Sequence, residues 1–126
     1  MQIHESAEDY LEAILILQEK HGEVRSIDIV NQTGYTKPSI SVAMKHLREN
    51  GYIVMDENGY ITLTDSGSAV AQRIYTRHRV LTQLLTDIGV GEETAAADAC
   101  KIEHDLSNET FQKIREYADR QRKQHG

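Results

Sequence analysis

The chain contains one cysteine, one proline and no apolar stretch long enough to cross a bilayer. A single cysteine cannot form an internal disulfide, so in a reducing compartment its thiol stays available to bind a metal. The longest apolar run, Ala13 to Leu17, is far shorter than the roughly 18 residues that a membrane span needs. The N-terminus lacks the basic segment followed by an apolar segment that marks a signal peptide. We therefore expect a cytoplasmic protein with no membrane partner.

Positive charge is also scarce, since the 126 residues carry a net charge of −6. This balance argues against non-specific binding to nucleic acid. The charges are nevertheless unevenly distributed along the chain. Residues 1–24 contain one lysine and no arginine, whereas residues 25–50 contain Arg25, Lys37, Lys45 and Arg48. A small cationic surface can therefore exist within an acidic protein.

Composition and length predict a mostly helical globular protein, because 39% of the residues are hydrophobic and 27% are charged. A chain of this length forms one ordinary domain or two small ones. The first predicted helix runs from Ser6 to about His21, with Ser6 as its N-cap. Asp9 follows Ser6 by three residues, which is the spacing of a capping box, so a helix-capping role for Asp9 is one alternative.

A second group of signals, within residues 26–64, predicts a DNA-binding motif. A short helix over 26–33, with Ile27 and Val30 facing inward, ends at a glycine, and Thr36 then caps a helix that reaches about residue 50. Asn58 and Gly59 separate two alternating apolar segments, 52–56 and 60–64, which indicates a β-hairpin. Helix, helix, turn, helix and hairpin in this order are typical of a winged helix-turn-helix.

The remaining residues predict three more helices. A long helix runs from about residue 68 to 88 and is broken by Gly89 and Gly91; a second runs from Glu92 or Glu93 to near Leu106. Ser107 would cap the last helix, whose polar tail from residue 120 we expect to fray. The fold class is mainly α with a small β-hairpin wing. We assign residues 1–67 to a DNA-binding domain and 68–126 to a helical metal-binding and dimerisation domain.

Cys100, Glu103 and His104 would lie on one face of the predicted helix, because side chains three and four residues apart stack above one another. A thiol, a carboxylate and an imidazole together suit a divalent transition metal. The alternatives are ordinary ones: a lone cysteine is often a small buried hydrophobe, and surface helices often carry a glutamate beside a histidine.

Residues 68–126 are too few to bury much apolar surface alone, so pairing with a second copy is expected. A dimer also suits double-stranded DNA. Two recognition helices related by a two-fold axis reach successive major grooves about 34 Å apart.

Several ordered blocks of the sequence resemble the diphtheria toxin repressor family. They are Glu8-Asp9-Tyr10-Leu11, Pro38-Ser39 in the helix-turn-helix, Arg77-His78-Arg79, Leu84 to Gly89, and Cys100 to Ser107. The resemblance implies a metal-dependent transcriptional repressor, with iron-responsive and manganese-responsive branches in the family. It also implies that the C-terminal SH3-like domain of longer members is missing here.

The resemblance places the metal ligands on six residues: Asp9, Glu12, His78, Cys100, Glu103 and His104. Without it, His78 between two arginines would be interpreted as part of a basic surface patch. The Cys100, Glu103 and His104 spacing resembles the iron branch, whereas Asp9 with Glu12 resembles the manganese branch, which has a carboxylate at position 100. We therefore expect Fe²⁺ or Mn²⁺ as the co-repressor, and Zn²⁺, Co²⁺ or Ni²⁺ can substitute in vitro.

The predicted DNA-binding residues lie at the start of the third helix, along it, and before the second helix. They are Arg25, Thr36, Lys37, Pro38, Ser39, Ser41, Lys45 and Arg48. Metal would promote their binding to operator DNA by fixing the first helix to the dimerisation helices. Two alternatives remain open at this point: a winged-helix regulator that senses a small organic molecule, and a small zinc metalloenzyme.

Overall fold

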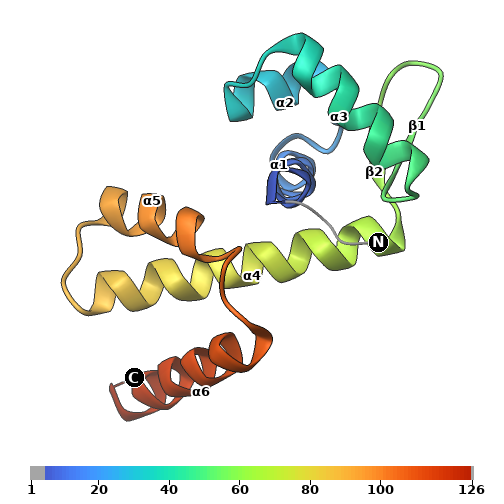
Figure 1. Cartoon of the computed structure of the whole chain (residues 1–126). Coiled ribbons are helices and arrows are strands. Elements are labelled where there is room, and N and C mark those ends of the chain that lie inside the picture. The colour runs from blue at the N-terminus through green and yellow to red at the C-terminus, as the bar shows by residue number, and fades with distance from the viewer. Residues whose placement is uncertain (1–4, 126) are drawn as a thin grey trace. The chain divides into compact units, whose positions relative to one another are not determined.

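The computed structural model describes residues 5–125, with side-chain surroundings for residues 6–123. The chain divides into two compact units, Met1–Arg73 and Ile74–Gly126. The elements follow in the order α1 (Glu5–His21), α2 (Ser26–Thr33), α3 (Lys37–Glu49), β1 (Ile53–Met55), β2 (Ile61–Leu63), α4 (Asp65–Asp87), α5 (Glu92–Ile102) and α6 (Asn108–His125). This composition confirms the predicted mainly α fold with a two-stranded wing (Figure 1). None of the described helices is both long and apolar enough to cross a membrane.

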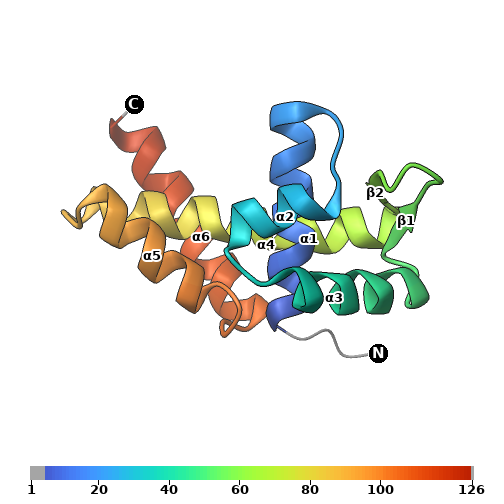
Figure 2. The ribbon, with the colours of Figure 1, turned by 90° about the horizontal axis from the view of Figure 1, so that it is seen from above.

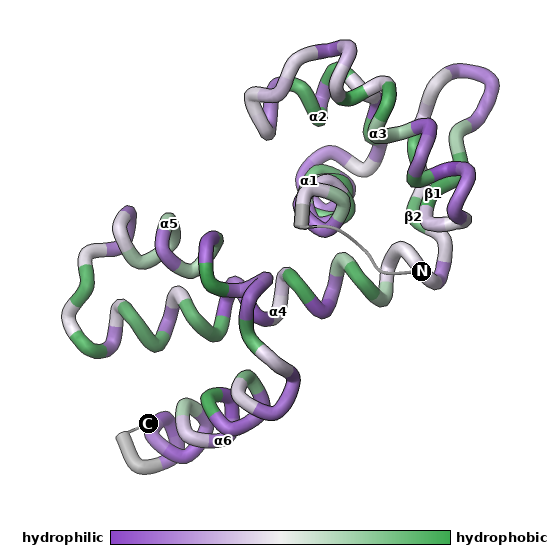
Figure 3. The backbone as a smooth tube through the Cα atoms, in the orientation of Figure 1, coloured by the Kyte–Doolittle hydropathy of each residue, from purple (hydrophilic) through white to green (hydrophobic). Residues whose placement is uncertain are grey.

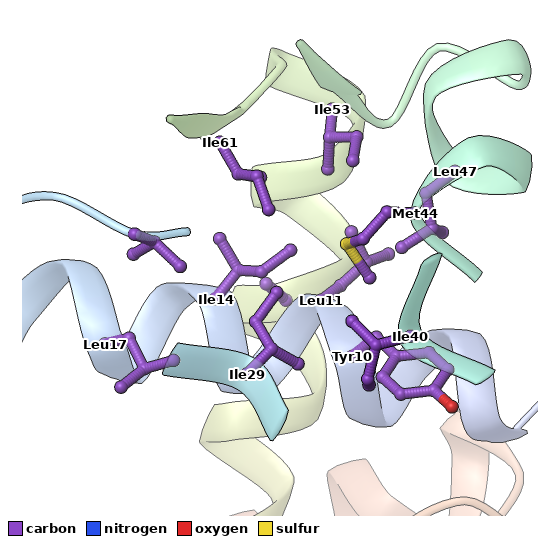
Figure 4. Close-up of a cluster of buried hydrophobic side chains, with 12 residues drawn as sticks. Tyr10, Leu11, Ile14, Leu17, Ile29, Ile40, Met44, Leu47, Ile53 and Ile61 are labelled. Atoms are coloured by element: carbon purple, nitrogen blue, oxygen red, sulfur yellow. The ribbon is translucent and has the colours of Figure 1, made fainter. Parts of the chain in front are cut away.

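The core of the first unit is built around α1, which Figure 1 views nearly end-on and Figure 2 from the side. Leu11 and Ile14 of α1 are fully buried against side chains of α2, α3 and the hairpin (Figure 4). The partners include Ile29, Ile40, Met44, Leu47, Ile53 and Ile61. Because α3 and the hairpin both pack on α1, the position of α3 depends on α1.

The predicted N-cap at Ser6 is wrong, because α1 is already helical at Glu5 and Ser6 lies inside the helix. Asp9 therefore does not occupy the third position after a Ser6 cap, and the capping-box alternative for Asp9 has no basis. Glu8 and Asp9 still favour this end of the helix, since carboxylates interact favourably with the positive end of the helix dipole.

The turn between α2 and α3 follows the prediction closely. Gly34 ends α2 with φ of +79°, a left-handed conformation that favours glycine. Thr36 then caps α3, because its Oγ1 accepts the N–H of Ser39 at 3.3 Å. Of the two inward residues predicted for α2, Val30 is partly buried and packs against the core, whereas Ile27 was predicted wrongly: Ile29 is buried and Ile27 is 43% exposed. These two residues lie about 200° apart around a helix, so only one can face the core.

The wing is an antiparallel pair in which Ile53 lies opposite Leu63 and Met55 opposite Ile61. At its tip, Asp56 Oδ1 accepts the N–H groups of Asn58 and Tyr60, both at 2.9 Å. This pairing accounts for the tight turn that Asn-Gly predicts. The hairpin is also tied to the segment before α2, because the N–H of Ile61 donates to the carbonyl of Val24 at 2.7 Å.

Helix α4 begins at Asp65, three residues earlier than predicted. Thr64 explains the early start, since its Oγ1 accepts the N–H of Gly67 at 3.2 Å and so satisfies a free donor of the first turn. Gly67 itself lies against the wing: a Cβ there would be 2.0 Å from the Tyr52 carbonyl oxygen. The glycine therefore permits a close approach of α4 to the chain that enters β1.

The second unit contains the remainder of α4, together with α5 and α6, and buries few large side chains. Its buried hydrophobic residues include Leu81, Phe111 and three alanines, Ala95, Ala99 and Ala118. Figure 3 shows that α6 is mostly hydrophilic in colour. Helix α6 continues to His125 and so includes most of the polar tail from residue 120, whose fraying stays a prediction. Ser107 caps the helix as predicted, accepting the N–H of Thr110 at 3.1 Å, and lysine and arginine near its C-terminus complement the helix dipole.

Candidate metal centre and DNA-binding surface

The carboxylate of Glu103 is the centre of a cluster of predicted ligands in the second unit. Glu103 is fully buried, and its Oε2 lies 2.9 Å from Nδ1 of His78. Its Oε1 lies 3.4 Å from Nε2 of His104. Cys100 Sγ lies within 4.8 Å of a Glu103 carboxylate oxygen. The structure thus brings His78, Cys100, Glu103 and His104 together, although His78 comes from α4, Cys100 from α5, and Glu103 and His104 from the turn after α5.

The helix that was predicted to carry Cys100, Glu103 and His104 ends earlier than predicted. Helix α5 stops at Ile102 and not near Leu106. Glu103 retains helical backbone angles, and its N–H still donates to Ala99 at 2.9 Å, so it lies one turn beyond Cys100 as the spacing requires. His104 belongs to the turn that follows, where the N–H of Asp105 donates to Ile102 at 3.1 Å. Two of the three ligands therefore follow helical geometry, and His104 is placed by a turn.

Sequence reasoning missed Arg77, which it named only as a neighbour of His78 that, without the family resemblance, would indicate a basic surface patch. Arg77 is only 4% exposed, whereas Arg79 is exposed and lies over the ring of Tyr75. A signal for this difference was available. Ile74, Arg77 and Leu81 follow the spacing of the buried face of a helix, so Arg77 occupies an apolar stripe.

Asp9 and Glu12 belong to the first unit, where both project from α1 one turn apart. Asp9 is half-buried and Glu12 is buried. Asp9 also affects its neighbour Tyr10: burial first, and then Tyr35 and the charge of Asp9, raise the pKa of the Tyr10 phenol above its usual value. Another carboxylate of the same helix, Glu8, is bonded to Arg73 at 2.8 Å.

The chemistry of the second-unit cluster fits a divalent transition metal. One thiol, two imidazoles and one carboxylate are ligand types that Fe²⁺, Co²⁺ and Zn²⁺ accept, and the carboxylate also suits Mn²⁺. Oε1 of Glu103 is buried and accepts no hydrogen bond from the residues that the structure describes. A buried carboxylate oxygen in this situation is costly, and a cation would satisfy it.

The predicted DNA-binding residues all lie on the surface of the first unit. Each of the eight, from Arg25 to Arg48, is exposed. Arg25 has a further contact, because its guanidinium lies 4.3 Å from the centre of the Tyr60 ring in the wing. Val42 on α3 is also exposed, at 57%, and offers an apolar contact beside the polar ones.

Comparison with known protein families identifies both parts of the chain. Residues 2–60 match the family described as "Iron dependent repressor, N-terminal DNA binding domain". Residues 64–126 match "Iron dependent repressor, metal binding and dimerisation domain". The chain belongs to the iron-dependent repressor family. This finding confirms the resemblance inferred from the sequence, and it identifies a metal-dependent transcriptional repressor and not an enzyme.

Individual relatives agree with this assignment. The repressor is 36% identical over 109 residues to the HTH-type transcriptional regulator MntR of Geobacillus thermodenitrificans, covering 86% of this chain and 77% of that protein. It is 32% identical to the transcriptional regulator MntR of Escherichia coli O157:H7, covering 88% of this chain and 72% of the relative. The alternatives of a metalloenzyme and of a sensor for an organic molecule are therefore set aside.

Solved structures show the same fold. The crystal structure of T. acidophilum IdeR superimposes with a TM-score of 0.79 at 30% identity, covering 93% of this chain and 55% of that one. A manganese-dependent transcriptional repressor in complex with manganese gives a TM-score of 0.82 at 28% identity, covering 90% of this chain and 52% of that one. The repressor thus spans about half the length of these two chains.

Proposed function

We propose that this repressor binds operator DNA in response to Fe²⁺ or Mn²⁺, which acts as a co-repressor. The proposed ligands are Asp9 and Glu12 of α1 with His78, Cys100, Glu103 and His104 of the second unit. The observation that carries the proposal is the convergence of four candidate ligands of the second unit around the buried Glu103 carboxylate. A bound divalent cation would supply the positive charge that offsets repulsion among the carboxylates.

The link from ligands to DNA runs through α1 in this proposal. Asp9 and Glu12 flank Leu11, and Leu11 and Ile14 pack in the same core as Ile40 and Met44 of the recognition helix α3. Fixing α1 through Asp9 and Glu12 would therefore restrict the positions that α3 adopts. DNA affinity would rise by population shift, because the ion favours the conformations in which all six ligands meet.

We further propose a homodimer that binds double-stranded operator DNA in the cytoplasm, with residues 1–67 as the DNA-binding domain and 68–126 as the metal-binding and dimerisation domain. The second unit buries few large side chains, and Ile88, Ile102 and Tyr117 are exposed there at 70%, 38% and 50%. A second copy would cover such residues. It would also place two recognition helices for successive major grooves, roughly 34 Å apart.

At the DNA, we propose that the start of α3 carries the specific contacts. The side chains of Thr36 and Ser39 are bonded to each other, Oγ1 to Oγ at 2.9 Å, and both are exposed, so that they could contact a phosphate or a base edge. Lys45 and Arg48 lie further along the helix and would contact phosphates. Arg25 would do so from the base of the wing, where Tyr60 holds its guanidinium.

The choice between Fe²⁺ and Mn²⁺ depends in this proposal on Cys100. Its thiolate is the only soft ligand of the set and favours Fe²⁺, Co²⁺ or Zn²⁺ over Mn²⁺. Three carboxylates, from Asp9, Glu12 and Glu103, are the hard ligands that Mn²⁺ prefers. We favour Fe²⁺, because the Cys100, Glu103 and His104 spacing resembles the iron branch of the family.

Anaerobic DNA binding tests the proposal. Duplexes are selected from a random pool with the protein and Mn²⁺ or Fe²⁺, and the affinity for a selected duplex is then measured by fluorescence anisotropy with each metal and with chelator. We expect metal to raise the affinity at least about fivefold, since coupling energies of about 1–3 kcal/mol are typical of such linkage. Equal affinities with metal and with chelator would refute the co-repressor mechanism. Glu103→Gln is expected to lose the metal response while retaining the weak metal-independent affinity.

A further inference from the structure

Arg77 is a buried cation that the ligand set does not use. A guanidinium that is taken out of water must recover its hydrogen bonds within the protein. Nη1 of Arg77 donates to the carbonyl oxygens of Glu103 at 3.0 Å and Leu106 at 2.8 Å. Nη2 donates to Oδ1 of Asn108 at 2.6 Å. The side chain thus joins α4 to the end of α5 and to the start of α6.

The segment that these bonds hold is the turn containing the last two ligands. Helix α5 ends at Ile102 and α6 begins at Asn108, so the carbonyls of Glu103 and Leu106 belong to no helical ladder. Arg77 bonds the residues on either side of His104 and thereby defines the course of the main chain through it. The ring of Phe111, 5.2 Å from the guanidinium carbon, packs against the same group and restricts its movement.

Consecutive residues of α4 therefore hold Glu103 at its two ends. Arg77 bonds its main-chain oxygen, and His78 bonds its carboxylate at 2.9 Å. Neighbouring residues on a helix project about 100° apart, so Arg77 and His78 reach the turn from different directions. The orientation of the Glu103 side chain is fixed by this pair of contacts.

We propose that Arg77 is a positioning residue for the metal centre, acting through the main chain of the turn to hold Glu103 and His104 in their binding orientation. This inference rests on the proposed function, in which Glu103 and His104 bind the metal. Groups that orient metal ligands typically contribute roughly 10- to 100-fold to metal affinity. Losing Arg77 would let the turn adopt several conformations, and metal binding would then have to select one of them.

The test uses Co²⁺ as the probe, because its visible absorption spectrum reports the number and geometry of the ligands. Arg77→Met removes the guanidinium and keeps a long side chain; Arg77→Lys keeps the charge but cannot span the same three acceptors. Arg79→Met is the matched control, because Arg79 is an exposed arginine of the same helix. Co²⁺ affinity is measured by anaerobic titration on the full chain, and the metal-free stability of each variant by thermal unfolding.

We expect Arg77→Met to weaken Co²⁺ binding by roughly 10- to 100-fold and to alter the spectrum at saturation, with Arg77→Lys between it and the wild type. Arg79→Met should change the affinity less than about twofold and leave the spectrum unaltered. A folded Arg77→Met protein with wild-type affinity and spectrum would overturn the positioning role.

If Arg77→Met does not fold, Asn108→Ala decides the question, since it removes one anchor of the guanidinium and leaves the cation in place. A folded Asn108→Ala protein should bind Co²⁺ more weakly and with an altered spectrum, and wild-type behaviour in both Asn108→Ala and Arg77→Lys would overturn the inference. Failure of the wild type itself to bind Co²⁺ would instead refute the proposed metal centre.

Discussion

Replacing Gly67 by alanine should destabilise the repressor, although alanine favours helices more than glycine does. The added Cβ would lie 2.0 Å from the Tyr52 carbonyl oxygen and 2.9 Å from its carbon. Relieving this contact to 3.0 Å requires a movement of about 1 Å in the chain that enters the wing. The same carbonyl accepts the N–H of Thr64 at 3.1 Å, so the movement also weakens a hydrogen bond.

The energies can be compared directly. Forcing a methyl group into a packed site costs about 1–3 kcal/mol, and a weakened hydrogen bond adds up to about 1 kcal/mol. The higher helix propensity of alanine stabilises the folded protein by about 1 kcal/mol. These figures combine to a range of about 0–3 kcal/mol, and from its middle we expect a net loss of about 1.5 kcal/mol, or a fall in Tm of roughly 4 °C for each kcal/mol.

Thermal and urea unfolding of the metal-free protein measure this effect. Ala69→Gly is the control, because Ala69 is exposed in the same helix and its replacement should cost only the difference in propensity, about 1 kcal/mol. A Gly67→Ala protein as stable as the wild type, or more stable, would show that α4 does not press against the wing as the geometry indicates.

Three further predictions concern the metal, the DNA and pH. Cys100→Glu should shift the ratio of activating Fe²⁺ and Mn²⁺ concentrations towards Mn²⁺, and an unchanged ratio would mean that Cys100 is not a ligand. The predicted DNA surface carries four basic side chains per subunit, so the slope of log K against log salt for a dimer should be shallower than about −7; a steeper slope would show that the surface is misplaced. The raised pKa of Tyr10 means that its contribution to stability is complete below about pH 10 and is lost as pH rises through the folded-state pKa. Urea unfolding between pH 9 and about 12 should therefore show a decline that Tyr10→Phe reduces.

Local signals in the sequence predicted the DNA-binding half of the fold. Gly34 must adopt a left-handed conformation, Thr36 caps the next helix through its own hydroxyl, and Asn58-Gly59 turns within the hairpin. Each of these features depends on a few neighbouring residues. The inward face of α2 does not, because an eight-residue helix with apolar residues at 27 and 29 offers two faces, and packing on α1 and α3 selects Ile29.

The candidate metal centre was predicted as a set of residues but not as a geometry. The family resemblance supplied His78, whose bond to Glu103 joins residues 25 positions apart. The end of α5 at Ile102 could not be read from the local sequence, because the carbonyls beyond it are satisfied by Arg77, which precedes them by 26 and 29 residues. A contact between residues so far apart leaves only one sign in the local sequence, which is a charged residue on the apolar stripe of a helix.

The adjacency of Arg77 and His78 limits how the sequence of this family can change. Inserting or deleting one residue in α4 between His78 and the buried Leu81 would rotate both side chains by about 100° relative to the part of the helix that packs in the second unit, and the turn would lose its main-chain anchor and its side-chain partner in a single event. Substitution at Cys100, in contrast, exchanges one ligand atom and leaves the main-chain bonds of Glu103 intact. We therefore expect natural relatives to diverge in metal preference by point substitutions at position 100 and its surroundings, while the spacing between Arg77, His78 and Leu81 stays constant.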